Sequence, residues 1–329
     1  MSADLDTAQP STSRETNRRT IQPYLPLMVV TTIIWGAAFP ISKSGLGDVP
    51  AATFALARFV IAAAILVPLV FVVRRGFHIS RRDWPKVALA GVLGFVVIQL
   101  GQNWGLSLSP ASDIAILTTT EPVSIALLGA YFLKEKPAPF FWVGLGLSLV
   151  GVLTVIGINP LTLFSSSTGS ASTENGNRLF GDLLFLGGTL GFAGYNVLNR
   201  GLSKRIDGLE FTGGAVSVGV VCLVPFALIE ILFGTATINF TGRAWVGILY
   251  TALLVTVFGF LALSWSLKRV PAARVALLFY LQPLSGVIIS WFGGEQLTWN
   301  FGVGAALILG GVYIAERASR ARTTLVSSE

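Results

Sequence analysis

Long apolar runs separated by short polar segments make up most of the sequence. Ten of these runs reach or approach the ~20 residues that a helix needs to cross a hydrocarbon core. They cover residues 25–43, 51–73, 86–107, 111–133, 138–157, 180–200, 209–233, 244–267, 272–292 and 299–316. The pattern therefore predicts an all-α membrane protein with ten transmembrane helices.

The polar segments alternate between many and few basic residues along the chain. If the N-terminus is cytoplasmic, only Lys43, Arg178 and Arg243 of the 23 Lys and Arg residues fall in outer segments, and Arg58 lies within a run. Cytoplasmic loops of membrane proteins are enriched in Lys and Arg. The distribution therefore predicts a multi-pass cell-membrane protein with both termini cytoplasmic.

The longest internal polar segment, 158–179, divides the chain into two halves of five predicted spans each. It contains the Ser- and Gly-rich run SSSTGSASTENGN, which predicts a flexible linker on the outer side. Because each half has an odd number of spans, we expect the second half to be inverted relative to the first. The predicted organisation is a disordered cytoplasmic tail at 1–24, five-helix repeats at 25–157 and 180–317, and a second cytoplasmic tail at 318–329.

The two halves also repeat individual residues in the same order. Trp104, Pro110 and Pro122 recur 161 positions later as Trp265, Pro271 and Pro283. A shift of 160 then relates Phe132 to Phe292, Glu135 to Glu295, Gly144 to Gly304 and Gly151 to Gly311. In the first span of each half the match is weaker, with Phe39 and Tyr195 as counterparts. These ordered matches support a duplicated chain with inverted repeats.

Composition agrees with the membrane assignment and excludes several functional classes. Only 12% of the residues are charged, against roughly 25% in soluble domains. The net charge of +7 resides in loops, so it indicates orientation rather than nucleic-acid binding. Cys222 is the only cysteine, which excludes an internal disulfide and a cysteine-based metal site. With no nucleotide-binding, metalloprotease or hydrolase motif, we expect no enzyme activity, no catalytic residues, no metal and no cofactor.

Glu121 is the most informative charge within a predicted span. It lies about ten residues into the fourth run, ~15 Å deep and near the middle of a ~30 Å core. A carboxyl group at that depth has to face a cavity, find a partner or be protonated. Two interpretations remain open: a proton-coupling site or partner of an ammonium group, and a protonated acid hydrogen-bonded within a kink. Gln282 occupies the matching place in the second half.

Pro122 and Pro283 directly follow these two residues. Proline cannot donate a backbone hydrogen bond and clashes with the preceding helical turn. We therefore predict a hinge or kink at both positions, at similar depth from opposite sides of the membrane.

Arg58 and Lys43 are the remaining charges within a span or at its end. Arg58 lies about seven residues into the second run, which places it ~10 Å deep, in the outer half. It has three open roles: binding a solute carboxylate, pairing with Asp48 or Asp113, or reaching outward to water. Lys43 ends the first run on the outer side. We favour a structural role for Arg58, and an interfacial or gating role for Lys43.

Polar and aromatic side chains within the spans are candidates for the lining of a central cavity. Aromatic walls with a few amides suit a neutral, zwitterionic or partly apolar solute, although Trp and Tyr also anchor spans at the membrane interface. Gln99 and Asn103 are four residues apart and share a helix face. The predicted cavity residues are Trp35, Phe39, Gln99, Asn103, Thr118, Glu121, Tyr195, Asn199, Tyr280 and Gln282.

Several sequence segments together resemble the EamA-type transporters of the drug/metabolite transporter superfamily. They are WGAAFPISK from Trp35, LARF around Arg58, EPVSIALLGAYFLKEK from Glu121, LQPLSGVIISWFGGEQL from Leu281 and GVGAALILGGVYI from Gly302. The resemblance covers about residues 25–317. It implies ten helices in two inverted five-helix repeats around a central cavity. It also implies a bacterial inner-membrane exporter or facilitator of small metabolites, often amino acids.

The duplication and the resemblance favour the same function. We expect a secondary transporter or facilitator that moves a small metabolite, such as an amino acid, by alternating access around a midplane site. The expected partners are a small-molecule substrate and the lipid bilayer, without nucleic acid, and the expected state is a monomer or weak dimer. A membrane enzyme or lipid-handling protein is the alternative, and a non-transporting receptor is a third.

Overall fold

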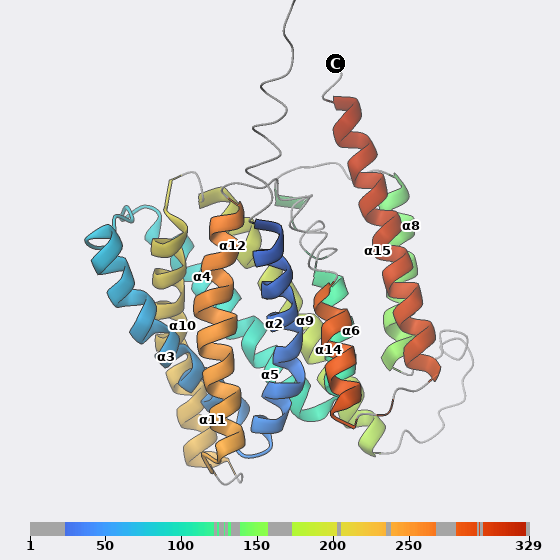
Figure 1. Ribbon diagram of the computed structural model, residues 1–329, viewed down its shortest axis with the longest axis horizontal. Coiled ribbons are helices and arrows are strands. Elements are labelled where there is room, and N and C mark those ends of the chain that lie inside the picture. Colours follow the sequence, from blue (N-terminus) through green and yellow to red (C-terminus); the bar gives the residue numbers. More distant parts are fainter. Residues whose placement is uncertain are drawn as a thin grey trace, which may run out of the picture.

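The computed structural model describes residues 24–326, apart from 122–123, 125–127, 129–130, 133–138, 157–172, 203–204, 235–237, 268–280, 295 and 297–298. Within the described residues every regular element is a helix. The long helices run side by side, and α2 begins and α15 ends at the same end of the bundle (Figure 1).

The described elements follow one another as short and long helices. They are α2 (Tyr24–Leu46), α3 (Ala51–Arg74), α4 (Trp84–Val92), η1 (Leu93–Val97), α5 (Ile98–Leu108), α6 (Ala111–Leu117), η2 (Thr118–Thr120), α8 (Pro139–Ile156), α9 (Thr173–Leu202), α10 (Gly208–Phe233), α11 (Gly242–Leu249), η3 (Tyr250–Gly259), α12 (Phe260–Leu267), α14 (Leu281–Phe292) and α15 (Trp299–Val326). The elements η1 and η3 are π-helical and η2 is a 3₁₀ helix.

Five helical segments are long and apolar enough to cross a membrane. They are Pro26–Leu46, Ala51–Arg74, Trp84–Leu108, Gly208–Phe233 and Gly242–Leu263. These segments coincide with the first, second, third, seventh and eighth predicted spans. The predicted spans 111–133 and 272–292 lie partly outside the described residues.

The predicted linker 158–179 is shorter than expected. Residues 173–179 already belong to α9, so helix replaces the last third of the linker. Leu179 packs against the buried apolar cluster, which explains why the chain is ordered here despite its polar neighbours. Residues 157–172 lie outside the described part of the chain.

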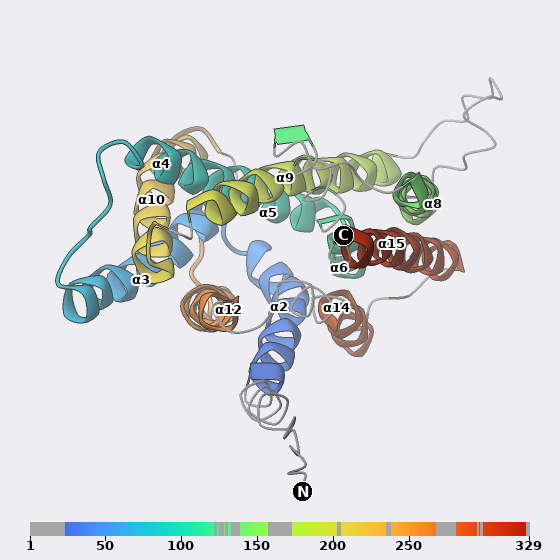
Figure 2. The same ribbon diagram turned by 90° about the horizontal axis from the view of Figure 1, so that it is seen from above.

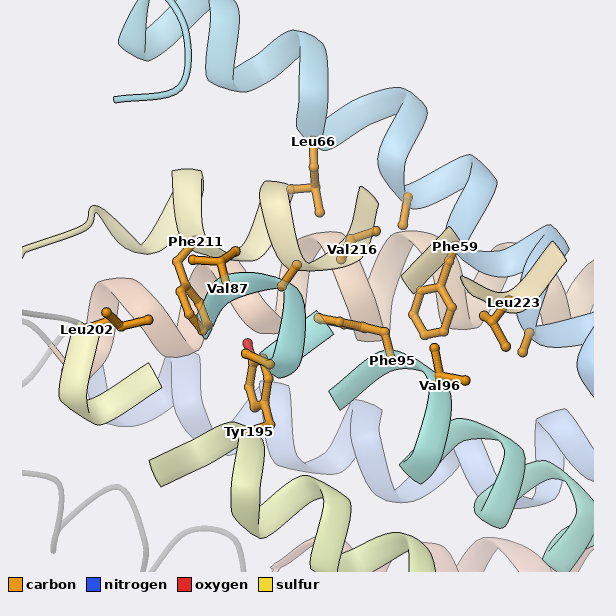
Figure 3. Packing of buried hydrophobic residues seen from close by; sticks show 14 of the residues in the cluster. Phe59, Leu66, Val87, Phe95, Val96, Tyr195, Leu202, Phe211, Val216 and Leu223 are labelled. Carbon is orange, nitrogen blue, oxygen red and sulfur yellow. The ribbon is translucent and has the colours of Figure 1, made fainter. Parts of the chain in front are cut away.

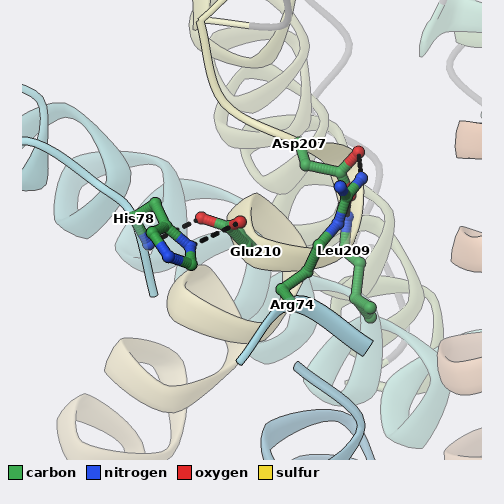
Figure 4. A network of polar contacts seen from close by, with 5 residues as sticks. All are labelled: Arg74, His78, Asp207, Leu209 and Glu210. Atoms are coloured by element: carbon green, nitrogen blue, oxygen red, sulfur yellow. Dashed lines mark hydrogen bonds and ion pairs between the residues drawn. The ribbon is translucent and has the colours of Figure 1, made fainter. Parts of the chain in front are cut away.

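The helices α3 and α10 are fastened to each other at both ends. Glu230 near the end of α10 accepts hydrogen bonds from the first-turn N–H groups of Ala52 (2.9 Å) and Thr53 (2.8 Å). Helices leave these N–H groups without internal partners, so the carboxylate of another helix acts as the cap of α3. At the opposite end, Arg74 pairs with Asp207, as Figure 4 shows.

The beginning of α10 carries two more contacts in Figure 4. Asp207 accepts a hydrogen bond from the backbone N–H of Leu209 (3.0 Å) and is the N-cap of α10. Glu210 accepts a hydrogen bond from the backbone N–H of His78 (2.8 Å). The loop after α3 is therefore held on the first turn of α10.

A large apolar core lies between α3, α4, η1, α9 and α10 (Figure 3). Its centre is aromatic: the Phe95 ring lies 5.2 Å from the Phe59 ring and 5.6 Å from the Tyr195 ring, both in edge-to-face geometry. Phe211 packs against the other side of Tyr195 at 5.7 Å. These contacts fix η1 against its neighbours.

Both halves carry a π-helical segment at the same place. The shift of 161 that relates Trp104 to Trp265 takes residues 93–97 of η1 to 254–258, which lie within η3. π-Helical turns are rare and often occur at functional sites. Nothing in the apolar pattern of the sequence indicated them.

The helices α8 and α15 stand side by side at one edge of the bundle, away from the α3–α10 pair (Figure 2). Glycines let their backbones touch. A Cβ on Gly151 would lie 2.7 Å from the carbonyl oxygen of Gly304, and a Cβ on Gly311 would lie 2.4 Å from that of Gly144. The shift of 160 exchanges these two contacts, so the pair has the contact pattern of a two-fold axis.

Candidate functional site

A small cavity of about 70 Å³ lies where both halves of the chain meet. It is lined by Trp35, Ala38 and Phe39 of α2, Arg58 of α3, Gly94 of η1, Ile98, Gln99 and Gln102 of α5, Glu121, Phe192 of α9, Val255 of η3, Phe260 of α12 and Gln282 of α14. A polar space of this size holds a few water molecules. A larger solute requires the surrounding helices or side chains to move.

Arg58 provides the positive charge of the cavity. Its side chain is 3% exposed. Its Nε donates to the hydroxyl of Thr256 (3.0 Å) and its Nη1 donates to the side-chain oxygen of Gln99 (2.8 Å). Neutral acceptors leave the charge itself uncompensated by these contacts.

The predicted pairing of Arg58 with Asp48 or Asp113 is wrong. Asp48 accepts a hydrogen bond from the hydroxyl of Thr241, and Asp113 forms an ion pair with Arg178 (2.6 Å). The alternative that Arg58 reaches outward to water is also wrong, because its side chain is buried. The role of binding a solute carboxylate remains a prediction.

Glu121 contributes the acidic group of the same cavity. It follows the 3₁₀ segment η2 directly, and its side chain is partly buried. No ion pair within 4.0 Å joins Glu121 to a cation among the described residues. The cavity therefore contains one guanidinium and one carboxyl group that do not neutralise each other directly.

Gln282 lies in the cavity wall, as expected from its match to Glu121. Its side chain is buried, and α2 approaches its backbone through Gly36. A Cβ on Gly36 would lie 2.2 Å from the Gln282 carbonyl oxygen, so only glycine permits this crossing of α2 and α14. Pro283 is buried in the first described turn of α14, whereas Pro122 lies outside the described residues. The hinge role of both prolines stays a prediction.

The π-helical segment η3 holds two of the cavity side chains. The Trp35 indole N–H donates to the backbone carbonyl of Val255 (3.1 Å). The next residue, Thr256, accepts from Arg58 and donates to the carbonyl of Thr251 (2.9 Å). Gly259 leaves room for the indole, since a Cβ there would lie 2.2 Å from its nitrogen. The irregular helix thus orients both an aromatic wall and the cation.

Four of the predicted cavity residues that the structure describes are not among the lining residues. Asn103 is buried and donates to the carbonyl of Ala51 (3.1 Å), and Thr118 donates to the carbonyl of Ala115 (2.6 Å). Tyr195 is part of the aromatic core, Asn199 is partly buried on α9, and Tyr280 lies outside the described residues.

The four-residue spacing of Gln99 and Asn103 correctly predicted a shared helix face. That face is turned toward α3, where Gln99 reaches Arg58 and Asn103 reaches the first turn. Of these two residues, only Gln99 lines the cavity. Lys43 lies at the end of α2 and donates to the carbonyl of Leu106 (2.8 Å), outside the cavity.

Several lining residues were not predicted from the sequence. Gln102 is a polar residue three positions after Gln99, and this helical spacing was the available signal. Phe192 and Phe260 are aromatic residues in apolar runs rich in Phe, which offer no such signal. Thr256, which contacts the cavity cation, lies in the π-helical segment η3.

A second, more open cavity of about 450 Å³ adjoins the same part of η3 and α12. Its wall is mostly apolar and includes Leu27, Phe258, Leu261 and Trp265, with Asp207 at the start of α10. Residues of the junction between η3 and α12 therefore line both cavities. The second cavity lies at the end of the bundle where α2 begins.

Apolar helices of membrane-spanning length around a polar cavity define a multi-pass membrane protein. The chain belongs to the EamA-like transporter family, whose sequence model matches residues 22–157 and again residues 179–316. The protein is therefore a transporter by family, and its two halves each match the same family unit.

Curated relatives are similar over nearly the whole chain. An uncharacterized transporter of Archaeoglobus fulgidus is 27% identical over 88% of this chain and 95% of its own length. A probable terminal-alkyne amino-acid exporter of Streptantibioticus cattleyicolor is 27% identical over 90% of this chain and 94% of its own. A probable amino-acid metabolite efflux pump of Salmonella typhimurium is 27% identical over 92% and 96%.

A solved crystal structure supports the fold alone. It superimposes with a TM-score of 0.58 and 19% sequence identity, over 90% of this chain and 97% of that chain. The helical arrangement is therefore shared with a protein whose sequence has diverged widely.

Proposed function

We propose that this protein is a secondary transporter or facilitator that exports an amino acid or a related amphipathic solute across a bacterial inner membrane. The observation that carries the proposal is that the central cavity contains both a guanidinium group and a carboxyl group. Arg58 and Glu121 line the same space without an ion pair between them, and aromatic side chains form much of the remaining wall. The names of two relatives, an amino-acid exporter and an amino-acid metabolite efflux pump, support the same class of solute.

A zwitterion complements this arrangement. The carboxylate of an amino acid pairs with the guanidinium of Arg58, and its ammonium group pairs with Glu121. Guanidinium–carboxylate pairs are charge-assisted and directional, so they orient the solute as well as attract it. The aromatic rings of Trp35, Phe39 and Phe260 then accept the side chain of the solute.

Several features support ten spans arranged as two inverted repeats with both termini cytoplasmic. The mirrored glycine contacts of α8 and α15 and the matched π segments are those expected of inverted halves. The start of α2 and the end of α15 lie at the same end of the bundle (Figure 1). With this orientation, Arg74 lies on the cytoplasmic side and Lys43 on the outer side.

Transport follows alternating access, in which the cavity opens to one side at a time. Glu121 is the proton-coupling candidate, and Pro122 and Pro283 are the hinge candidates. The partners are the solute and the lipid bilayer, and the protein acts as a monomer or weak dimer.

Flux into liposomes containing only the purified full-length protein tests the proposal. Each candidate amino acid is compared with its decarboxylated amine and its deaminated acid, which lack one charge each. We expect the zwitterion to be transported best, and Arg58→Gln to reduce this preference over the amine. Arg58→Lys is the matched control, because it keeps the charge but loses the planar fork that contacts Thr256 and Gln99.

Absence of flux for every amino acid, or an unchanged preference in Arg58→Gln, would contradict the proposal. The alternative, a membrane enzyme or lipid-handling protein, predicts a different result in the same liposomes. Movement or conversion of a labelled phospholipid without solute flux would favour that alternative.

A further inference from the structure

Polar contacts join four helices at the end of the bundle opposite the start of α2. Lys43 on α2 donates to the carbonyls of Leu106 (2.8 Å) and Ser109 at the end of α5. The Ser109 hydroxyl donates to the carbonyl of Arg178 on α9 (2.9 Å). Arg178 forms an ion pair with Asp113 on α6 (2.6 Å). We name Lys43, Ser109, Asp113 and Arg178 the outer latch.

Close backbone packing seals the same place. A Cβ on Gly181 of α9 would lie 3.0 Å from the carbonyl oxygen of Gly105 on α5, and 2.5 Å from the Ser109 hydroxyl. A Cβ on Gly105 would lie 2.9 Å from the carbonyl oxygen of Gly181. Since the two backbones touch, a solute passes between α5 and α9 here only after they separate.

Asp182 lies beside the outer latch, one turn beyond Arg178 on α9. Its side chain is 0% exposed, and neither carboxylate oxygen accepts a hydrogen bond of ordinary geometry from the described residues. It faces Asp113, Ser109, Arg178 and Lys43. The helix α8 also packs against α9 and carries no titratable residue. Asp182 is therefore a buried acid beside a second carboxylate, and its polar neighbours Lys43, Ser109 and Arg178 are each engaged by another partner.

The sequence repeat does not reproduce the outer latch, whose residues come from both sides of the linker. The shift of 156 that relates Phe39 to Tyr195 takes Lys43 to Asn199 and Asp182 to Pro26. The shift of 161 takes Asp113 to Arg274. The residues that the repeat relates to Asp113 and Asp182 are therefore not acids, so this pair of carboxylates distinguishes the two sides of the membrane.

We propose that Asp182 is the proton-binding residue of an outer gate, which is closed when Asp182 is protonated and opens when it releases its proton outward. The proposal rests on the orientation given in the proposed function, which places the outer latch on the outer side. It is independent of which solute is transported.

The sign of the pH dependence follows from the burial of Asp182. Burial is the largest cost of the Asp182 carboxylate ion, and the nearby Asp113 carboxylate adds repulsion. The attraction of Arg178 and Lys43 and the contact with Ser109 oppose these costs but are smaller than the cost of burial. Protonation is therefore favoured on balance in the closed state, whereas water solvates the ion in the open state. The closed state thus binds one more proton, so a higher outer pH favours opening, by up to about tenfold in the open-to-closed ratio per pH unit.

Accessibility of the central cavity from outside measures the gate without any substrate. Cys222 is the only cysteine, so Cys222→Ser provides a background without thiols. Ala38→Cys then places one thiol in the cavity wall. The rate of its modification by a membrane-impermeant charged thiol reagent is followed in right-side-out vesicles, while the outer pH is varied at constant inner pH.

We expect modification, corrected for the reactivity of the free reagent with a small thiol, to accelerate as the outer pH rises. Asp182→Asn mimics the protonated acid and should give slow modification at every pH, whereas Asp182→Glu should retain the pH dependence. Asp48→Asn is the matched control, because Asp48 is an outer-side carboxylate that has a hydroxyl donor. It should behave like the parent.

Equal pH dependence in Asp182→Asn and the parent would overturn the proposal. So would loss of the pH dependence in Glu121→Gln together with its retention in Asp182→Asn, since the responsible group would then be in the cavity. A gate that responds through Asp182 in a protein without amino-acid flux would support this inference and contradict the proposed function. The experiments can therefore refute either proposal without refuting the other.

Discussion

The mirrored glycines of α8 and α15 make a quantitative prediction about matched substitutions. Gly151→Ala places a methyl group 2.7 Å from the carbonyl oxygen of Gly304, and Gly311→Ala places one 2.4 Å from that of Gly144. Each contact is with backbone, which cannot rotate away as a side chain does. Overpacking of this kind costs about 1–3 kcal/mol.

The neighbouring Gly146 provides the matched control. A Cβ on Gly146 meets no atom within 4 Å, so Gly146→Ala gains helix propensity without a clash. Gly→Ala favours a helix by roughly 1 kcal/mol, and this gain is common to Gly146→Ala, Gly151→Ala and Gly311→Ala. The difference between Gly151→Ala and Gly146→Ala therefore isolates the overpacking cost of about 1–3 kcal/mol.

Equilibrium unfolding of the purified protein in mixed micelles measures this difference. We expect Gly151→Ala and Gly311→Ala to be destabilised to a similar extent relative to Gly146→Ala, because the two contacts are equivalent. Equal stability of Gly151→Ala and Gly146→Ala would refute the packing argument. A large effect at Gly151 with none at Gly311 would refute the equivalence of the two contacts.

Three further predictions concern the cavity and its surroundings. Thr256→Val removes a hydrogen bond to a buried cation, worth about 1.5–3 kcal/mol, and should raise the half-saturating solute concentration about tenfold or more, measured by flux. Asn103→Leu should lower the thermal midpoint without changing solute preference, because Asn103 contacts the Ala51 carbonyl and not the cavity; altered preference would contradict this placement. Glu121→Gln should abolish the dependence of flux on the pH of the cavity side while leaving the protein folded, and unchanged dependence would reject proton coupling at this residue.

The sequence carried enough information to predict five helical segments that are long and apolar enough to cross a membrane, and several residues of the cavity wall. Trp35, Phe39, Gln99, Glu121 and Gln282 line one cavity, as their positions within apolar runs suggested. A polar residue in such a run is costly unless it faces other protein or water, so sequence alone restricts where it lies. The position of a polar residue within a span did not by itself show whether the residue lines the cavity, since Asn103 and Thr118 contact backbone carbonyls outside it.

The partners of Arg58 show what sequence alone could not provide. An arginine in a membrane span suggests a carboxylate partner, and Asp48 and Asp113 were the candidates. The actual partners, Thr256 and Gln99, are neutral and come from helices in different halves. Thr256 lies in the π-helical segment η3, and neither periodicity nor propensity in the sequence predicts such turns.

Asp113 was misassigned for a related reason. Its true partner, Arg178, lies in what the composition predicted to be the end of a flexible linker. The Ser- and Gly-rich run predicts a linker by composition, but its last residues, 173–177, belong to α9. Composition therefore does not indicate where the next helix begins. Three-dimensional placement of α9 was needed to bring these charges together.

The capping of α3 by Glu230 has a consequence for biosynthesis. Translation proceeds from the N-terminus, so α3 enters the membrane long before the residue that caps it, which lies 178 positions beyond Ala52. Until α10 arrives, water or lipid headgroups have to satisfy the first N–H groups of α3, because hydrocarbon cannot. The helix α3 of the first half is thus capped only after the ribosome has synthesised α10 of the second half.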